Sequence, residues 1–189
     1  ASIYIGTRSA AVRRVTFALT LAGFALNTAA IIARGIAAGH PPIANLFEYL
    51  SLFAWAAAFG FLLIWRRKGL ELLTVLASPV AFALIVVASL FPTEVNQQLI
   101  PALQSYWLWI HVSLAVLGEA AFAVAFVASV LYLIRGDGPS SRLPDPEALD
   151  RVTYRAIGIG FPLFTIGALF AGAVWAQQAE TPPAQGLLH

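Results

Sequence analysis

Long apolar runs separated by short polar segments dominate the pattern of this chain. Five runs are each close to or above about 20 residues, the length that a helix rising about 1.5 Å per residue needs to cross about 30 Å of hydrocarbon. They are solidly apolar and do not alternate as the strands of a membrane barrel would. They cover approximately residues 12–37, 44–65, 72–91, 106–134 and 156–176. The pattern predicts an all-α polytopic membrane protein with a bundle of five transmembrane helices, and an outer amphipathic helix is expected over residues 94–104.

Basic residues set the expected orientation of these helices. Ten of the eleven Lys and Arg residues fall on one side of the predicted spans, and short basic loops mark the cytoplasmic side. They are Arg8, Arg13, Arg14, Arg66, Arg67, Lys68, Arg135, Arg142, Arg151 and Arg155. Only Arg34 lies near the other end of the first span, where its long side chain can snorkel to the interface. We expect the N-terminus inside, the C-terminus outside, one transmembrane domain over residues 1–179 and a polar external tail over 180–189.

Composition supports the membrane class and excludes others. Sixty per cent of the residues are hydrophobic, 11% are charged and the mean hydropathy is +0.81, so a water-soluble domain could not cover its own surface. The net charge of +2 reflects the flanks of the spans, and nucleic acid is not an expected partner. Because the chain has no cysteine, it has no disulfide, thiolate metal site or Cys-x-x-Cys-His haem attachment site of its own.

His111 is the first candidate for site chemistry. It lies about five residues past Tyr106, roughly 8 Å along the fourth span and close to the outer interface. A neutral imidazole there can ligate haem iron or take a proton, whereas the alternative is an interfacial hydrogen bond to a backbone carbonyl or water. Trp107 and Trp109 beside it are typical of an aromatic belt, although an aromatic shelf also suits a porphyrin.

His40 is a candidate second ligand on the same outer side. It precedes Pro41 and Pro42 at the mouth between the first two spans, where a solvated loop histidine is the alternative interpretation.

Two carboxylates lie within the spans. Glu48 is one turn inside the second span, where it can cap helix ends or meet a cation. Glu119 lies about 18 Å down the fourth span, near the midplane, and should be protonated or paired because an unpaired buried charge is costly. A structural hydrogen bond to a neighbouring helix and a functional proton site both fit it. Its angular offset from His111 would let the two border one interhelical groove without touching.

Three motifs in order then carry a resemblance to a known family. Residues 39–48 read Gly-His-Pro-Pro-Ile-Ala-Asn-Leu-Phe-Glu and residues 99–112 read Leu-Ile-Pro-Ala-Leu-Gln-Ser-Tyr-Trp-Leu-Trp-Ile-His-Val. Residues 154–162 read Tyr-Arg-Ala-Ile-Gly-Ile-Gly-Phe-Pro and are followed at 172–176 by Gly-Ala-Val-Trp-Ala. Together they resemble the cytochrome c assembly family of the CcsA or ResC type.

The resemblance implies a haem-handling membrane protein of cytochrome c biogenesis. Members of this family carry haem to the outer face and help attach it to the Cys-x-x-Cys-His motif of apocytochrome c. His111 matches the family's first external haem-ligating histidine. Asn45 and Glu48 match an outer-face Asn-Leu-Tyr-Glu motif, for which a structural or pocket-lining role is expected.

The sequence also departs from the family pattern. The tryptophan-rich external loop and the second external histidine are not in it, because a polar segment, Gln-Gln-Ala-Glu-Thr-Pro-Pro, follows Ala176. Glu119 stands where the family usually has an aromatic residue, most often tyrosine. The chain is therefore expected to be either a fragment or a reduced relative, and the polar tail favours the reduced relative.

Two functions remain open from the sequence. One is haem handling in cytochrome c maturation, with His111 and His40 as iron ligands, Trp107 and Trp109 as cofactor contacts, and no catalytic residue in the chain alone. The other is a non-catalytic accessory subunit packed into a larger respiratory or photosynthetic membrane complex. Expected partners are the lipid bilayer, other membrane subunits and apocytochrome c. The expected location is the bacterial plasma membrane, which is favoured over the thylakoid membrane. The functional face is expected to be extracytoplasmic.

Overall fold

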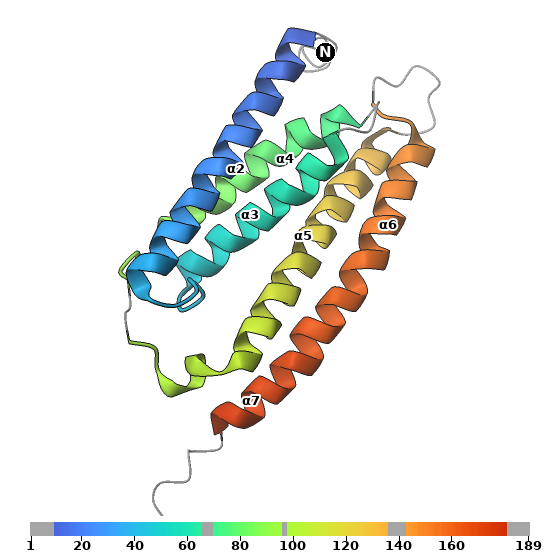
Figure 1. Ribbon diagram of the computed structural model, residues 1–189. Helices are drawn as coiled ribbons and strands as arrows, with labels where there is room; N and C mark the ends of the chain where they lie inside the picture. The colour runs from blue at the N-terminus through green and yellow to red at the C-terminus, as the bar shows by residue number, and fades with distance from the viewer. Residues whose placement is uncertain (1–9, 66–69, 96–97, 136–142, 181–189) are drawn as a thin grey trace, which may run out of the picture.

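The computed structural model describes residues 10–65, 70–95, 98–135 and 143–180, and within these ranges it is helical with no strand (Figure 1). The long helices are α2 (Ala10–Ala38), α3 (Leu46–Trp65), α4 (Glu71–Ala88) and α5 (Tyr106–Arg135). The last helical stretch runs through α6 (Pro146–Phe164), a π-helical segment η2 (Thr165–Ala171) and α7 (Gly172–Glu180). The predicted all-α class is confirmed.

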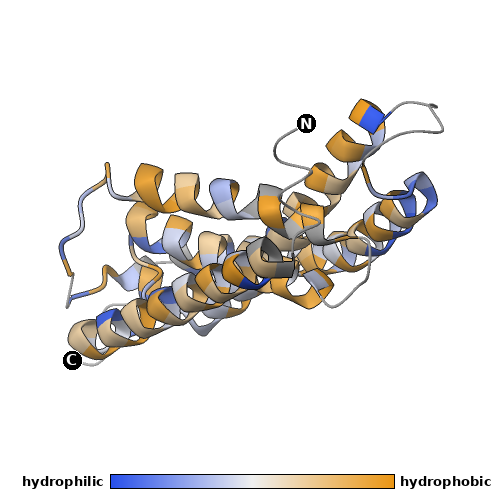
Figure 2. Cartoon of the chain, turned by 90° about the horizontal axis from the view of Figure 1, so that it is seen from above, coloured by the Kyte–Doolittle hydropathy of each residue, from blue (hydrophilic) through white to orange (hydrophobic). Residues whose placement is uncertain are grey.

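Four of these helical stretches are long and apolar enough to cross a membrane. They are Arg14–Ala38, Leu46–Trp65, Tyr106–Arg135 and Pro146–Gln178. Helix α4, predicted as a span over residues 72–91, is shorter at 18 residues and contains Pro79. Figure 2 shows the reason for the membrane class, since hydrophobic colour runs along the helices and hydrophilic colour gathers toward their ends.

The last helix is longer than its apolar run. The predicted span covered residues 156–176, whereas the helix begins at Pro146, which lies at its first turn after the N-cap Asp145. A 33-residue helix is about 50 Å long and exceeds about 30 Å of hydrocarbon, so its charged first turns extend past the apolar part. Hydropathy locates the span and does not locate the helix end.

The segment between α4 and α5 differs from the expectation of an amphipathic helix over residues 94–104. Only Pro101–Gln104 is helical there, as the single 3-10 turn η1, and the other described residues of the segment are non-helical. Pro101 fits the first position of that turn because it lacks the N–H that a helix interior needs.

The helices pack as a bundle around α3 and α5. A core of buried side chains, centred on Phe61, Leu73 and Leu149, joins α3, α4, α5 and α6. Helix α2 lies at the outside of this bundle, with Leu19, Leu26 and other apolar side chains exposed (Figure 1). The start of α2, the end of α5 and the start of α6 lie at one end of the bundle, and α7 and η1 lie at the other.

Glycines allow α5 and the last helix to approach closely. A Cβ atom on Gly118 would lie 2.9 Å from the backbone nitrogen of Phe164, and one on Gly160 would lie 3.0 Å from the Cβ of Ala121. Small residues at such crossings let the backbones of membrane helices come into contact. Gly160 therefore has a role in packing the last helix against α5. A Cβ atom on Gly158, in contrast, would face open space with nothing within 4 Å.

Candidate functional site

His111 lies on α5, one and a half turns after the helix begins at Tyr106, and faces the last helix. Its Nδ1 atom is 2.9 Å from the carbonyl oxygen of Gly167 in η2. Its ring stacks on Trp175 of α7, with ring centroids 5.8 Å apart and planes inclined by 16°. Because a carbonyl can only accept, Nδ1 donates this hydrogen bond, and in the neutral ring Nε2 then carries the lone pair.

The His111 ring has room because Gly172 has no side chain. A Cβ atom at Gly172 would lie 2.8 Å from Nδ1 and 3.0 Å from Cε1 of the ring. The acceptor Gly167 is equally constrained, since its Cβ would lie 2.5 Å from the Cβ of Leu114. Gly167 lies within the π-helical turns and Gly172 directly follows them, and such a distortion is frequent at functional sites.

Ser105 fixes the start of α5 below this histidine. Its hydroxyl oxygen accepts from the backbone N–H of Trp107 at 3.2 Å, which satisfies one of the free donors of the helix start. The same hydroxyl donates to the side-chain oxygen of Gln178 on the last helix at 2.8 Å. The first turn of α5 is thus tied to the turn that carries Trp175.

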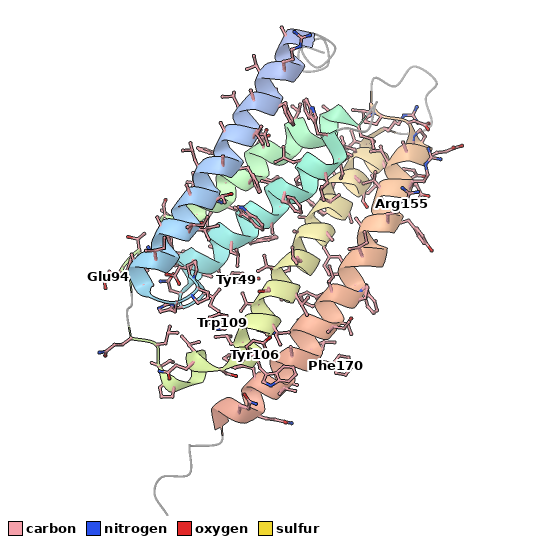
Figure 3. All side chains as sticks on the ribbon, viewed as in Figure 1. Tyr49, Glu94, Tyr106, Trp109, Arg155 and Phe170 are labelled. Carbon is pink, nitrogen blue, oxygen red and sulfur yellow. The ribbon has the colours of Figure 1, made fainter. Side chains whose placement is uncertain are left out.

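The two tryptophans beside His111 lie at the surface of the bundle. Trp107 is 38% exposed and Trp109 is 41% exposed, which suits an interfacial belt. In Figure 3, Trp109 lies at the same end of the bundle as Tyr49 and Tyr106.

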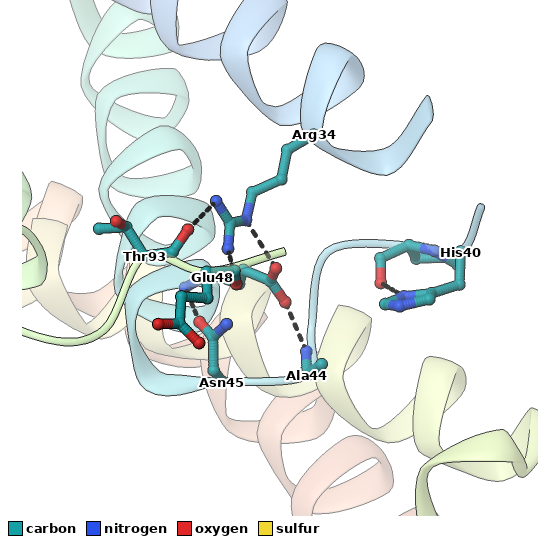
Figure 4. A network of polar contacts seen from close by, with 8 residues as sticks. Arg34, His40, Ala44, Asn45, Glu48 and Thr93 are labelled. Carbon is teal, nitrogen blue, oxygen red and sulfur yellow. Dashed lines mark hydrogen bonds and ion pairs between the residues drawn. The ribbon is translucent and has the colours of Figure 1, made fainter. Parts of the chain in front are cut away.

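His40 lies in the loop between α2 and α3 and is half-buried. Its Nδ1 atom is 2.8 Å from the carbonyl oxygen of Pro41, so it donates a hydrogen bond within its own loop (Figure 4). The turn before it is made by Gly39, whose φ of +76° is unfavourable for residues with a Cβ.

Arg34 and Glu48 form a second polar centre at this end of the bundle (Figure 4). The Nε of Arg34 lies 2.6 Å from Oε1 of Glu48, a carboxylate that is only 1% exposed. The other two guanidinium nitrogens donate to the carbonyls of Thr93 at 2.8 Å and Glu94 at 2.7 Å. Arg34 therefore does more than snorkel to the interface, because it holds the segment that follows α4.

Glu48 has both of the roles that its position suggested. Its second oxygen accepts from the backbone N–H of Ala44 at 2.7 Å, while Arg34 binds the first. Asn45 completes the helix start, since its side-chain oxygen accepts from the N–H of Glu48 at 2.9 Å.

Glu119 is paired across the interface between α5 and α3. The hydroxyl of Tyr49 donates a hydrogen bond to Oε2 of Glu119. A structural hydrogen bond to a neighbouring helix, one of the two expected roles, is therefore present. The expectation that Glu119 and His111 border one groove is not met, because Glu119 faces α3 and His111 faces η2 and α7.

The structure brings His111 together with residues that sequence reasoning had not assigned to a site. Trp175 and Gly172 belong to the last of the three motifs, and Arg34 is the one basic residue on the outer side, so the sequence contains a feature that could have indicated each of them. No sequence feature indicates Tyr49, because an aromatic residue in an apolar helix is ordinary. The stacking of His111 on Trp175 and the two interhelical pairs, Arg34 with Glu48 and Tyr49 with Glu119, depend on which helices become neighbours.

The chain is similar in sequence to proteins of one family. Residues 43–180 match the family model described as cytochrome C assembly protein. Proteins named cytochrome c biogenesis protein CcsA are similar to the chain at 32% identity in Synechococcus elongatus, covering 78% of this chain and 61% of that protein. The same name and identity are found in Pyropia yezoensis, with 88% and 66% covered, and in Chlamydomonas reinhardtii, with 94% and 52% covered. The chain thus spans roughly three fifths of the length of these relatives. It belongs to the cytochrome c assembly family.

Proposed function

We propose that this chain handles haem at the extracytoplasmic face of a membrane during cytochrome c biogenesis, with His111 as an axial ligand of the iron. The observation that carries the proposal is the hydrogen bond from His111 Nδ1 to the Gly167 carbonyl. A metal-bound histidine usually donates its other ring N–H to such an acceptor, which fixes the tautomer and the ring orientation.

The donor set of the chain fits haem better than a bare metal ion. Among the described residues, no three His, Cys, Asp or Glu side chains lie close enough to hold a metal. A porphyrin supplies four nitrogen ligands of the iron itself, so the protein needs to provide only axial ligands. When bound to His111, haem would supply an iron centre whose state is visible in the absorption spectrum.

The residues around His111 would orient that ligand. The Gly167 carbonyl holds Nδ1 and Trp175 covers one ring face, so the imidazole has little rotational freedom left to lose on binding iron. Trp107 and Trp109 are proposed as apolar contacts for the porphyrin edge because both lie exposed beside the histidine. Glu48 would act at a distance by fixing the outer loops through Arg34, and Glu119 by joining α5 to α3.

His40 is proposed as the second ligand from within this chain. Its Nδ1 also donates to a carbonyl, and such a hydrogen bond orients the imidazole ring and sets its tautomer. It lies on the loop at the same end of the bundle as η1 and the start of α5, the end to which His111 belongs.

This function requires a defined topology. We propose five spans with α4 as the third, the N-terminus inside and the C-terminus outside, because basic residues gather at the end where α5 stops and α6 starts. That orientation puts His111 and His40 on the outer side. The proposed location is the bacterial plasma membrane, with the thylakoid as the alternative.

Apocytochrome c is the proposed protein partner, since the relatives are named for cytochrome c biogenesis. Other membrane subunits are further partners.

The second candidate function is a non-catalytic accessory subunit, and it draws support from a specific observation. Helix α2 presents large apolar side chains outward along its length, an area that another membrane helix could cover as well as lipid can.

An absorption spectrum of the purified chain tests the proposal. The wild-type protein should carry a histidine-ligated haem band, His111→Gly should lose it, and added imidazole should restore it by occupying the vacated position. His40→Gly should change the spectrum from six-coordinate to five-coordinate without abolishing it. A haem-free wild-type chain that co-purifies with a respiratory or photosynthetic complex would instead support the accessory role. Circular dichroism on each variant separates loss of ligand from loss of fold.

A further inference from the structure

A groove lies between α3, α5 and α6, away from the His111 site. It has a volume of about 390 Å³, within the range of ligand pockets in proteins. Its walls are apolar and include Leu63 of α3, Leu117 of α5, and Ile159 and Leu163 of α6. Leu63 is 63% exposed and Ile159 is 59% exposed, so the groove opens on the outer surface of the bundle, where lipid would lie.

Among the described residues that line this groove, Arg155 is the one that carries a charge. It lies on α6 toward the end of the bundle opposite Tyr106 and Trp109 (Figure 3). It is also the last charged residue before the apolar run, because no other follows until Glu180. The groove therefore begins at a cation near the edge of the hydrocarbon and continues among apolar side chains.

No carboxylate of the described chain neutralises this arginine. One turn away on α6 are Arg151, Val152, Gly158 and Ile159, and none of them is acidic. Glu147 pairs with Arg151 at 3.5 Å, and the described ion pairs do not include Arg155. A guanidinium at the membrane edge with no anion among the described residues is a suitable partner for an anion from the bilayer itself.

We propose that the groove binds an anionic phospholipid, with the phosphate on Arg155 and an acyl chain between α3, α5 and α6. A guanidinium recognises phosphate oxygens through two parallel hydrogen bonds. Basic pockets between transmembrane helices are known sites for acidic headgroups. A zwitterionic lipid offers the same phosphate beside its own ammonium group, so the excess charge of phosphatidylglycerol is what Arg155 distinguishes.

Native mass spectrometry of the detergent-purified chain tests this site. Phosphatidylglycerol and phosphatidylcholine with identical acyl chains are added in equal amounts. The wild-type chain should retain one phosphatidylglycerol about tenfold more than phosphatidylcholine, corresponding to roughly 1.4 kcal/mol. Arg155→Gln should bring the two lipids to equal retention, Arg155→Lys should keep part of the preference, and Arg151→Gln is the matched control that should keep all of it. Equal retention of both lipids by the wild-type chain, or an unchanged preference in Arg155→Gln, would overturn the proposal.

Two further measurements separate the lipid from other sources of phosphate and locate its chain. Inorganic phosphate and glycerol phosphate should not displace the bound lipid, because they cannot fill the apolar groove; displacement by either would mean an anion site without a lipid site. Phosphatidylglycerol with a photoreactive acyl chain should label peptides around Leu117 and Ile159, and labelling confined to α2 would contradict the assignment. The haem spectrum of Arg155→Gln should equal that of the wild type, so the two proposals succeed or fail separately.

Discussion

Arg34 on α2 and Glu48 on α3 form an ion pair with Nε and Oε1 2.6 Å apart, and the two side chains are 14% and 1% exposed. The same guanidinium lies 4.9 Å from the ring centre of Phe47 and binds the carbonyls of Thr93 and Glu94. One side chain thus joins α2, α3 and the segment that leads from α4 to η1 and α5. The His111 site lies at the far end of that segment.

Removing one partner of this pair should strongly destabilise the outer end of the bundle. Arg34→Met leaves the Glu48 carboxylate buried without its cation, and breaking a buried pair costs about 3–5 kcal/mol. Glu48→Leu should cost a similar amount, whereas the double variant should cost clearly less than the sum, because neither charge remains. The free energy of unfolding in mixed micelles measures all three. Additive losses would mean that the two residues act independently.

The glycine beneath His111 gives a sharper test of the site. Gly172→Ala places a Cβ 2.8 Å from the ring nitrogen, so the ring must move, and overpacking of this kind costs about 1–3 kcal/mol. If haem binds, the same variant should shift the haem band or reduce its intensity. Gly158→Ala is the matched control on the same helical stretch, because nothing lies within 4 Å of its Cβ position. That control should be neutral or gain up to about 1 kcal/mol from helix propensity. If Gly172→Ala and Gly158→Ala had equal effects, the position of the His111 ring would not depend on the space left by Gly172.

The pair between Tyr49 and Glu119 should be structural and modest in energy. Tyr49→Phe removes the donor and should cost about 1 kcal/mol, in line with hydrogen bonds between membrane helices. Glu119→Gln keeps a carbonyl acceptor and should cost less than Glu119→Leu, which leaves the tyrosine hydroxyl without its partner. Tyr154→Phe serves as control because Tyr154 is 79% exposed. The ranking is measured by thermal unfolding in detergent, and a Glu119→Gln variant as unstable as Glu119→Leu would show that the negative charge itself is needed.

The absence of cysteine makes the proposed topology directly measurable. Gln98→Cys and Asp150→Cys each introduce one thiol at an exposed position, on the η1 side and the α6 side respectively. With the proposed orientation, a membrane-impermeant maleimide should label the first in intact cells and the second only after permeabilisation. The opposite pattern would place the His111 end in the cytoplasm and remove the extracytoplasmic role.

Much of the helical framework could be predicted from the sequence. The predicted runs at residues 44–65 and 106–134 differ by no more than two residues at either end from α3, Leu46–Trp65, and α5, Tyr106–Arg135. Uncharged apolar runs define spans because unpaired charge is expensive in hydrocarbon. The start of the last helix was less predictable, since the turns over residues 146–155 are charged and helical at once, and hydropathy does not report on helix propensity outside the membrane.

The membrane class, the positions of the apolar helices and the family could be inferred from the sequence, because these depend on composition, on local periodicity and on short motifs. Which residues face one another depends on the tertiary structure. His111 meets Gly167 and Trp175 because Gly172 and the π-helical turns bring the last helix close to α5. Arg34 meets Glu48, and Tyr49 meets Glu119, because α2 and α5 both pack against α3. Such pairings follow from helix packing in three dimensions, and no periodicity along one helix encodes the identity of its neighbour.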